Sequence, residues 1–191
     1  MNNSVVIRSL RIKDILRVSK MNLSLEEGDR RFFHPFPFQL WKLAPIIAFI
    51  SVSSAIHKVL RRFFPQAVFL ALVAEDTRTN IAAGFGYLRL KEQLRDNEYI
   101  ACLGVVINKT YRGGLGMRLM EELIRLASQN NVSRISLTVL SENQRAIHLY
   151  RRCGFNIVNE VIDRRNGKSY PAYEMTLVLS KSDAQQMKRV E

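Results

Sequence analysis

Cysteine and histidine are scarce in this chain of 191 residues. Its two cysteines, Cys102 and Cys153, form no CxxC pattern, and because no signal peptide is evident we expect reduced thiols in a cytoplasmic protein. The three histidines are scattered and offer no metal-ligand spacing, so we expect no metal. Repeats, low-complexity tracts and linkers are also lacking, which predicts one domain over residues 1–180 and a polar tail over 181–191.

Acidic residues are outnumbered, because 17 Asp and Glu stand against 29 Lys and Arg and give a formal net charge of +12. This excess favours polyanionic partners, namely phosphate-bearing cofactors, nucleic acid or an anionic membrane. A solvated basic surface without a partner is an equally good interpretation. A nucleic-acid-binding module is the less favoured alternative, because the chain has no helix-turn-helix, zinc or RNP motif.

Hydrophobic patterning predicts a mixed α/β domain with one twisted sheet covered by helices. Asp14 can cap a helix that ends near Leu25, with Ile15, Val18 and Met21 or Leu23 facing inward. Apolar or alternating runs predict strands. These strands are expected at VVIRSL (5–10), AVFLALVAE (67–75), IAAGFGYLRL (81–90), YIACLGVVI (99–107), RISLTVL (134–140), FNIVNEVIDR (155–164) and YEMTLVLS (173–180), the last two joined around Asn166-Gly167.

The segment before the second strand combines a proline with an apolar run. Pro45 is expected near the first turn of a helix that ends before Pro65. Its apolar stripe is predicted to contain Ile46, Phe49, Ile50, Ile56 and Leu60. The run is too short and too interrupted by serines to span a bilayer, which takes about 20 residues. A helix packed on the sheet is the favoured interpretation, and contact with an anionic membrane surface through Lys58, Arg61 and Arg62 is the alternative.

The stretch YRGGLG (111–116) stands between the strand at 99–107 and a segment with a helical pattern. That helix is predicted to bury one face made of Leu119, Met120, Leu123, Ile124 and Ala127. A glycine-rich turn at a helix start exposes unpaired N–H groups at the positive end of the helix dipole, which suits phosphate. Glycine needed only for the backbone of the turn is the alternative. The stretch matches neither a Walker loop nor a GxGxxG fingerprint.

Two segments, LGVVINKTYRGGLGMRLMEELI and LTVLSENQRAIHLYRRCGF, closely resemble the GNAT superfamily of acyl-CoA N-acyltransferases. In that family a [QR]-x-x-G-x-[GA] pyrophosphate loop precedes an N-x-x-A-x-x-L-Y-x-x-x-G-F segment. The second motif is complete here, at Asn143, Ala146, Leu149, Tyr150, Gly154 and Phe155. The first departs from the pattern, because Tyr111 stands where Gln or Arg is expected and Arg112 follows it. The resemblance is specific over 99–157.

The resemblance implies an N-acetyltransferase that moves an acetyl group from acetyl-CoA to a primary amine by direct attack, as a monomer or homodimer. It implies a single mixed, mostly antiparallel twisted sheet with helices on both faces and a central parallel, splayed strand pair. The acyl-CoA-binding core is expected over 99–157, and acceptor-side elements over 1–65. The implied cofactor-binding residues are Val105, Val106, Arg112, Gly113, Gly114, Gly116, Met117 and Asn143. Seven residues make about two helical turns, so Asn143 and Tyr150 should face the same side.

In that mechanism Tyr150 is the acid that protonates the departing thiolate, and Glu98 is the candidate base that deprotonates the amine. His34 and Phe36 are candidates for the wall of the acceptor pocket. Each has a simpler alternative. Asn143 could be only a helix cap, Tyr150 a packed aromatic and Glu98 a surface charge, and a protein that binds acyl-CoA without turnover would keep the same motifs.

Overall fold

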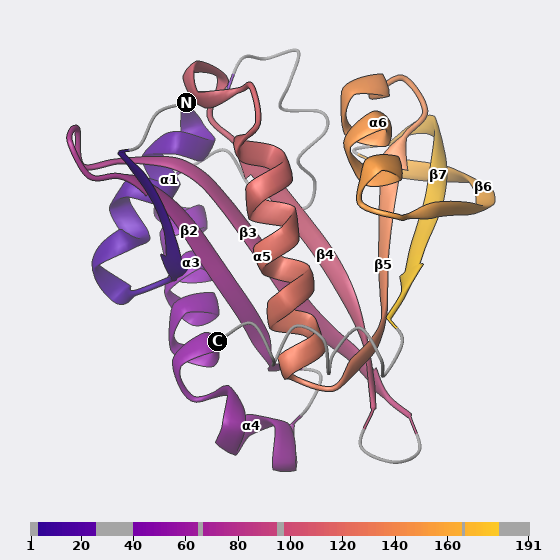
Figure 1. Ribbon diagram of the computed structural model, residues 1–191, viewed down its shortest axis with the longest axis horizontal. Coiled ribbons are helices and arrows are strands. Elements are labelled where there is room, and N and C mark those ends of the chain that lie inside the picture. The colour runs from indigo at the N-terminus through magenta and orange to yellow at the C-terminus, as the bar shows by residue number, and fades with distance from the viewer. Residues whose placement is uncertain (1–3, 26–39, 65–66, 95–97, 166, 180–191) are drawn as a thin grey trace.

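The computed structural model describes residues 4–25, 40–64, 67–94, 98–165 and 167–179. A single sheet of seven strands crosses it in the order β1-β2-β3-β4-β5-β7-β6 (Figure 1). The strands are β1 (Val5–Ser9), β2 (Phe69–Asp76), β3 (Ile81–Gln93), β4 (Tyr99–Ile107), β5 (Val132–Leu140), β6 (Asn156–Arg165) and β7 (Lys168–Val178). Only β4 and β5 run parallel. The predicted mixed, mostly antiparallel sheet with a central parallel pair is confirmed.

Helices lie on both faces of this sheet, as expected (Figure 1). They are α1 (Ile15–Leu23), α3 (Leu40–Ala55), α4 (His57–Phe63), α5 (Leu115–Gln129) and α6 (Gln144–Arg152), with short 3-10 turns at Ile12–Asp14 and Lys109–Tyr111. α1 and α3 pack on one face of β2 and β3, and α5 packs on the other. α6 packs on β5 and β7, on the same face as α5.

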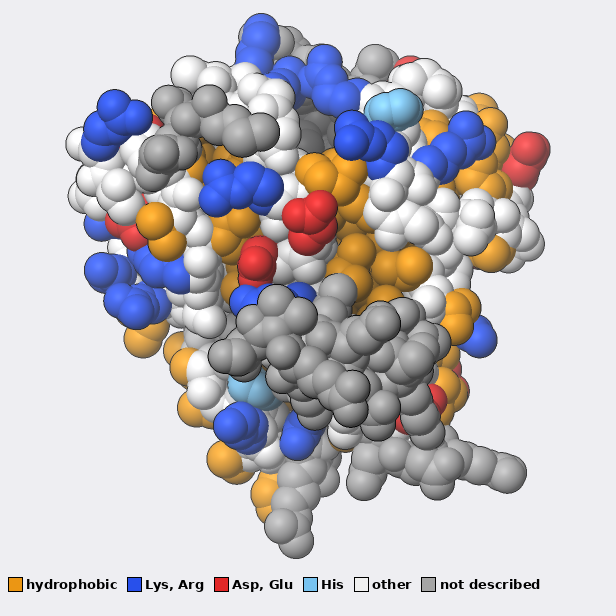
Figure 2. All heavy atoms as spheres, in the orientation of Figure 1, with side chains coloured by type: hydrophobic (Ala, Val, Ile, Leu, Met, Phe, Trp, Pro, Cys, Tyr) orange, Lys and Arg blue, Asp and Glu red, His pale blue; other side chains and the backbone are white. Residues whose placement is uncertain are grey.

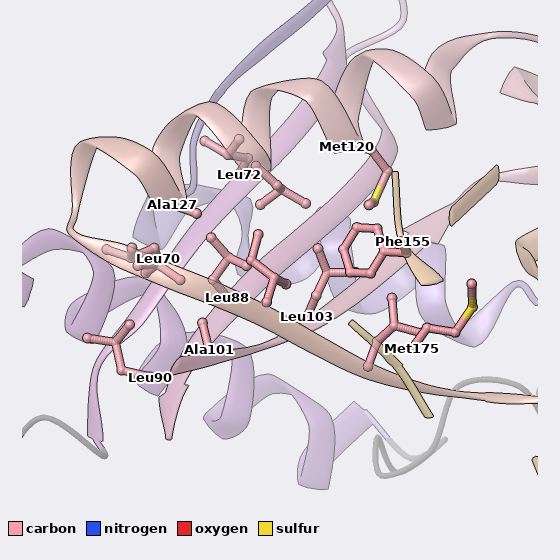
Figure 3. Close-up of a cluster of buried hydrophobic side chains, with 14 of the residues drawn as sticks. Leu70, Leu72, Leu88, Leu90, Ala101, Leu103, Met120, Ala127, Phe155 and Met175 are labelled. Carbon is pink, nitrogen blue, oxygen red and sulfur yellow. The ribbon is translucent and has the colours of Figure 1, made fainter. Parts of the chain in front are cut away.

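The core beneath α5 confirms the predicted phase of this helix. Leu119, Met120, Leu123 and Ala127 are fully buried, and Ile124 lies at the edge of the same cluster. Figure 3 shows Met120 and Ala127 facing leucines of β2, β3 and β4. Each buried leucine or methionine side chain contributes about 1.5–3 kcal/mol through the apolar surface it removes from water. The start of α5, where the glycine turn lies, is thereby held firmly against the sheet.

The predicted stripe of the helix after Pro45 is wrong for three of its five members, since only Ile50 is buried and Leu60 packs against the core. The helical segment begins by Leu40, carries Pro45 inside α3, and is interrupted at Ile56 before α4. Leu43, Ile47 and Ile50 form the buried face, whereas Ile46, Phe49 and Ile56 are exposed. Because apolar residues occur all around this helix, the sequence pattern did not distinguish the inner face from the outer one. In the described part of the chain, no helix is long and apolar enough to cross a membrane.

Asp14 precedes α1 as predicted but does not cap it with its side chain. Its carboxylate is fully buried, accepts hydrogen bonds from the Arg8 guanidinium at 2.6 and 2.8 Å, and accepts a third from the backbone N–H of Arg11 at 2.9 Å. Arg8 also binds Glu75 of β2, which Arg17 of α1 contacts at 2.6 Å. Burial acts to raise the pKa of Asp14, but the hydrogen bonds from Arg8 and from the N–H of Arg11, together with the charges of Arg8 and Arg17, outweigh it and the pKa is lowered. The network ties α1 to β1 and β2.

The closing hairpin of β6 and β7 is also confirmed, with Arg165 paired to Lys168 at its tip. Gly167 has a positive φ of 75°, as a tight turn requires. Asn166 lies outside the described residues. The hairpin pairs with β5 through β7, which completes the sheet on the side of α6.

Candidate active site

The two parallel strands separate halfway along their length. β4 and β5 are paired from Tyr99–Val132 up to Cys102–Ser136, and beyond that point neither strand has a partner in the other. Each strand keeps its outer neighbour there, because β3 follows β4 to Ile107 and β7 follows β5 to Leu140. The opening is therefore a wedge in the middle of the sheet, whose backbone edges are available to another chain-like group. This is the splay expected from the resemblance.

A cavity of about 350 Å³ occupies this wedge and continues between α5 and α6. Its lining includes Val105 and Val106 of β4, the glycine turn and the inner side of α6. All the residues predicted to bind the cofactor line it, and Tyr150 does too; they are Val105, Val106, Arg112, Gly113, Gly114, Gly116, Met117 and Asn143. The structure thus brings together residues from four separate stretches of sequence at one opening.

The glycine turn has the backbone that its sequence requires. Gly113 and Gly114 have φ values of 108° and 109°, which side chains other than glycine rarely adopt. A Cβ added at either would have no atom within 4 Å, so both face open space, whereas one at Gly116 would stand 3.2 Å from a methyl of Leu149 in α6. The first two glycines therefore keep the cavity edge bare, and Gly116 allows α5 and α6 to approach each other.

The departure from the family pattern at Tyr111 has a structural explanation. The Tyr111 hydroxyl donates a hydrogen bond of 2.8 Å to Asp76 in β2 and lies 3.3 Å from the hydroxyl of Thr79. The side chain is thus tied to the turn between β2 and β3 and does not line the cavity, whereas Arg112 does. The cationic residue of the loop is Arg112, and Tyr111 anchors the loop behind it.

Figure 2 shows Lys and Arg side chains gathered where the glycine turn and α6 meet the surface. Arg112, Arg145 and Arg152 line the cavity there, together with His148. These guanidinium groups converge from the loop and from α6, with the start of the α5 dipole between them. Such an edge suits an anionic group with several phosphates.

α6 presents Asn143 and Tyr150 to the same cavity, as their spacing predicted. Asn143 is the N-cap of the helix, since its Oδ1 accepts a hydrogen bond of 3.2 Å from the N–H of Ala146. Tyr150 is half-buried, and its ring packs against Phe155 at 5.9 Å between centroids. Burial raises the pKa of the Tyr150 phenol to about 12, with further contributions from Cys153 and Tyr87. The group therefore holds its proton throughout the neutral range.

Glu98 is the predicted residue that the structure does not bring to the site. It precedes Tyr99 at the closed end of the strand pair, and it does not line the cavity. Seven residues of extended chain separate it from Val105, which is about 23 Å. His34 and Phe36, the expected walls of the acceptor pocket, lie outside the described residues.

Sequence reasoning missed a row of polar side chains on the sheet face opposite α5. Cys102 and Ser136 share this face, because their Sγ and Oγ atoms are 3.7 Å apart. By strand alternation, Gly104 and Thr138 two residues further share it as well. Tyr87 of β3 is paired with Gly104, and Glu174 of β7 is paired with Thr138. Residues directly opposite in antiparallel strands point to the same side, so this face has a phenol on one side of the wedge and a carboxylate on the other.

The sequence did not predict that these residues lie on one face, because no local pattern in it indicates that β7 lies beside β5. Tyr87 and Thr138 line the cavity, and Tyr87 lies close enough to Tyr150 to affect its pKa. The Glu174 carboxylate is half-buried and accepts a hydrogen bond of 3.0 Å from Asn159 of β6. The wedge thus has a basic edge beside α5 and α6 and the Tyr87 phenol on the opposite face, while Glu174 lies next to Thr138 on the neighbouring strand and is not part of the cavity lining.

Comparison with known proteins agrees with this geometry. A curated relative, the L-amino acid N-acetyltransferase AaaT of Escherichia coli, is 32% identical over 98 residues. That alignment covers 49% of this chain and 60% of the relative. A GNAT acetyltransferase from Streptococcus pneumoniae is 24% identical, with a TM-score of 0.69 over 92% of this chain and 99% of that one.

A GNAT phosphinothricin acetyltransferase from Sinorhizobium meliloti, solved in complex with acetyl-CoA, is 15% identical, with a TM-score of 0.70 over 93% of this chain and 90% of that one. At such identities the two structures establish a common fold. Residues 37–155 of this chain, more than half of its length, also match the model of the Acetyltransferase (GNAT) family. The chain therefore belongs to the GNAT family of acetyltransferases.

Proposed function

We propose that this protein transfers an acetyl group from acetyl-CoA to a primary amine that approaches from the Tyr87–Glu174 face. One observation carries the proposal. The pairing of β4 and β5 ends at Cys102–Ser136 and opens into a cavity that holds the glycine turn, Asn143 and Tyr150 together. A phosphate cradle alone would bind many nucleotides, but an open strand edge beside it suits a long arm that ends at a reactive group.

The residues fit acetyl-CoA by their chemistry. The bare N–H groups of Gly113 and Gly114 and the guanidinium of Arg112 would hold the pyrophosphate. The backbone of β4 at Val105 and Val106 would pair with the pantetheine arm, and Asn143 would donate to it from its amide. When bound, acetyl-CoA supplies a thioester whose acetyl group passes to the amine while coenzyme A leaves as a thiol.

Two groups of this chain would act on the reacting atoms from the side of β4 and α6. The N–H of Val105 would polarise the acetyl carbonyl, which is worth about 3–4 kcal/mol for a well-placed donor. Tyr150 would deliver its phenolic proton to the departing sulfur. With a pKa near 12, raised by burial, the phenol stays protonated at neutral pH and regains its proton readily after each turnover.

Glu174 replaces Glu98 as our candidate for the proton acceptor. A primary amine arrives as an ammonium ion and must lose a proton before it can attack. Glu174 lies level with the opening, since it pairs with Thr138, two residues past the last joined pair. Its carboxylate would attract the ammonium ion and take its proton, directly or through a water, while Tyr87 faces it across the wedge.

The experiment that tests the proposal is release of free thiol from acetyl-CoA with a panel of primary amines, beginning with L-amino acids. Tyr150→Phe keeps the ring and removes only the proton donor. We expect kcat to fall by about 10²-fold, the low end for general acid catalysis, because water partly replaces the phenol. Tyr170→Phe, the same change on β7 away from the cavity, should leave kcat unchanged.

Binding and turnover are separated by thermal stability. Acetyl-CoA should raise the melting temperature of both variants, because it binds only the folded protein. A protein that is stabilised by acetyl-CoA but releases no thiol with any amine would be a binding protein without turnover, and the proposed reaction would be abandoned. An undiminished kcat in Tyr150→Phe would remove Tyr150 from the mechanism and leave it as a packed aromatic.

A further inference from the structure

α3 and α4 present a second apolar face to solvent, in addition to the one buried on the sheet. Its members recur every three or four residues across both helices, which is the spacing of one helix face. They are Trp41, Pro45, Phe49, Val52, Ile56, Val59 and Phe63, and the side chains other than Pro45 range in exposure from 44% at Val52 to 73% at Trp41. We call these seven residues the outer stripe. Large exposed apolar side chains in such number on two consecutive helices are of the kind that marks an interaction site.

The inner face of α3 is held on the sheet by buried apolar side chains and by serine hydrogen bonds, and Phe49 is the member of the outer stripe that also contacts the sheet. Ser53 accepts a hydrogen bond from the N–H of Phe69 at 2.9 Å and donates one to the carbonyl of Ala67 at 2.7 Å. Ser54 accepts from the N–H of Ala71 at 3.1 Å. The two serines thus satisfy backbone groups at the start of β2, where β1 does not lie beside it. β1 pairs only with Leu72 and the residues after it. Ser53 and Ser54 of α3 therefore face the sheet together with its buried leucine and isoleucines, and further large apolar side chains face outward.

The charge of the segment that carries the outer stripe has one sign. Residues 30–74 contain no Asp or Glu but have six Lys and Arg, eight of the ten Phe and the single Trp of the chain. Lys42 and Lys58 of these two helices are exposed, and the Lys42 Nζ lies 4.9 Å from the centre of the Trp41 ring. At the lower left of Figure 2, where α3 and α4 lie, hydrophobic and basic side chains stand next to each other. Aromatic rings with lysines beside them suit the interface between lipid and water.

We propose that the outer stripe binds the surface of an anionic lipid membrane, with α3 and α4 lying in the plane of the interface. The 16 residues of α3 extend about 24 Å, less than the hydrocarbon core of a bilayer, so the helix would lie on a membrane and not cross it. A second copy of this chain is a poorer occupant. A symmetric contact would bring together two copies of a segment that has no Asp or Glu, whereas anionic headgroups complement its lysines.

This binding would also orient the active site. Phe49 of the outer stripe packs on Phe69 at 5.8 Å between centroids, and Phe69 packs on Tyr87 at 5.7 Å. Tyr87 lines the cavity on the side assigned to the amine. Three rings in series thus connect the membrane-binding face to the acceptor side of the wedge. The membrane proposal itself rests on the exposed face and its charge, and does not depend on acetyl transfer.

Trp41 is an intrinsic fluorescence probe for this surface, because it is the single tryptophan of the chain and lies on the outer stripe. The full chain is titrated with vesicles of phosphatidylcholine containing about one-third phosphatidylglycerol, and with vesicles of phosphatidylcholine alone, while Trp41 emission is recorded. We expect a blue shift and co-sedimentation with the anionic vesicles, weakened by salt, and little change with the neutral ones.

Two pairs of variants with matched controls locate the binding surface and leave Trp41 in place. Val59→Ser with Phe63→Ser should weaken partitioning into anionic vesicles at least about tenfold. Val158→Ser with Ile162→Ser removes equally exposed apolar side chains from β6 and should not. Lys58→Glu should weaken it about tenfold, whereas Lys168→Glu, with the same change in net charge at the tip of the β6–β7 hairpin, should change it less than about twofold.

Three results would overturn the proposal. The first is an emission spectrum of Trp41 that does not move with anionic vesicles. The second is a free protein whose Trp41 emission is already blue-shifted and resistant to acrylamide at all protein concentrations, which would mean that the chain covers its own outer stripe. The third is a lipid-free dimer, seen by sedimentation, that Val59→Ser with Phe63→Ser dissociates, which would assign the outer stripe to a second copy.

Discussion

The ring of Tyr87 lies flat against Gly104, the residue paired with it on the neighbouring strand. A Cβ added at Gly104 would stand 2.5 Å from Cε1 of that ring and 2.8 Å from its hydroxyl oxygen, distances that real Cβ atoms do not tolerate. Gly104 therefore exists as glycine to let the phenol of β3 reach over β4 to the wedge. There its pKa is raised by burial to about 12, so the hydroxyl remains a donor at neutral pH.

Gly104→Ala should consequently cost stability and displace the phenol. We expect the free energy of unfolding in urea to fall by about 1–3 kcal/mol, as for overpacking of a well-filled site. In a Tyr87→Ala background the obstruction is gone, so the same substitution should cost much less, and the double-mutant cycle measures the difference. An equal cost in both backgrounds would mean that the phenol does not lie where the structure places it.

Gly114→Val should abolish the rise in melting temperature that acetyl-CoA produces. The added side chain meets no protein atom, so the change acts by filling the cradle and straining a φ of 109°. Gly167→Val is the matched control, because it also has a positive φ and open surroundings but lies in the β6–β7 turn. Both should lose about 1–2 kcal/mol of stability. Only the first should lose the response to acetyl-CoA, and a surviving response would reject the loop as the pyrophosphate site.

The contrast between α5 and α3 shows what patterning could predict. In α5, polar residues fill one face, so the positions of Leu119 and Leu123 were predicted correctly from spacing alone. In α3 both faces are apolar, and only the bonds that Ser53 and Ser54 make to β2 decide which one turns inward. Those bonds depend on where β1 ends beside β2. That information belongs to the assembled sheet and not to any local stretch.

The site residues divide in the same way, into those that a local pattern predicts and those that depend on the order of the strands in the sheet. Arg112, Asn143 and Tyr150 were predicted because they lie in short segments that carry their own pattern, and the cavity contains all three. Glu98 was chosen for its nearness in sequence to the cofactor strand, and it lies at the end of that strand away from the opening. Glu174, our candidate in its place, could not be chosen from the sequence, because its place beside Thr138 follows from the strand order β5-β7-β6, in which the last two strands exchange sequence order.

Glu174→Gln tests the acceptor side. Removal of the negative charge should raise the KM for the amine and lower kcat/KM by about 10–100-fold, while KM for acetyl-CoA stays unchanged. The loss should be smaller at higher pH, where more of the amine is already neutral. Glu160→Gln on β6 is the control, since its partner Tyr173 lies on the face of α6. A loss that does not depend on pH would limit Glu174 to a structural role.

The last prediction concerns the buried carboxylate of Asp14. In the wild type its pKa is lowered from 3.8, because the hydrogen bonds from Arg8 and Arg11 and the charges of Arg8 and Arg17 together outweigh the opposing effect of burial. Its contribution to stability is therefore complete above about pH 4 and is lost as the pH falls through the lowered value.

Arg8→Ala leaves the carboxylate buried with only the more distant Arg17, at 3.6 Å, as a cationic partner. We expect a loss of about 3 kcal/mol at neutral pH in urea unfolding, the low end for a broken buried pair. The loss should shrink toward about pH 4.5, because the unpaired carboxyl of the variant takes up a proton there and the wild type does not. Arg125→Ala, which breaks the exposed pair with Glu122, should cost less than about 1 kcal/mol at either pH. A penalty for Arg8→Ala that is the same at both pH values would assign it to lost packing and not to the charge of Asp14.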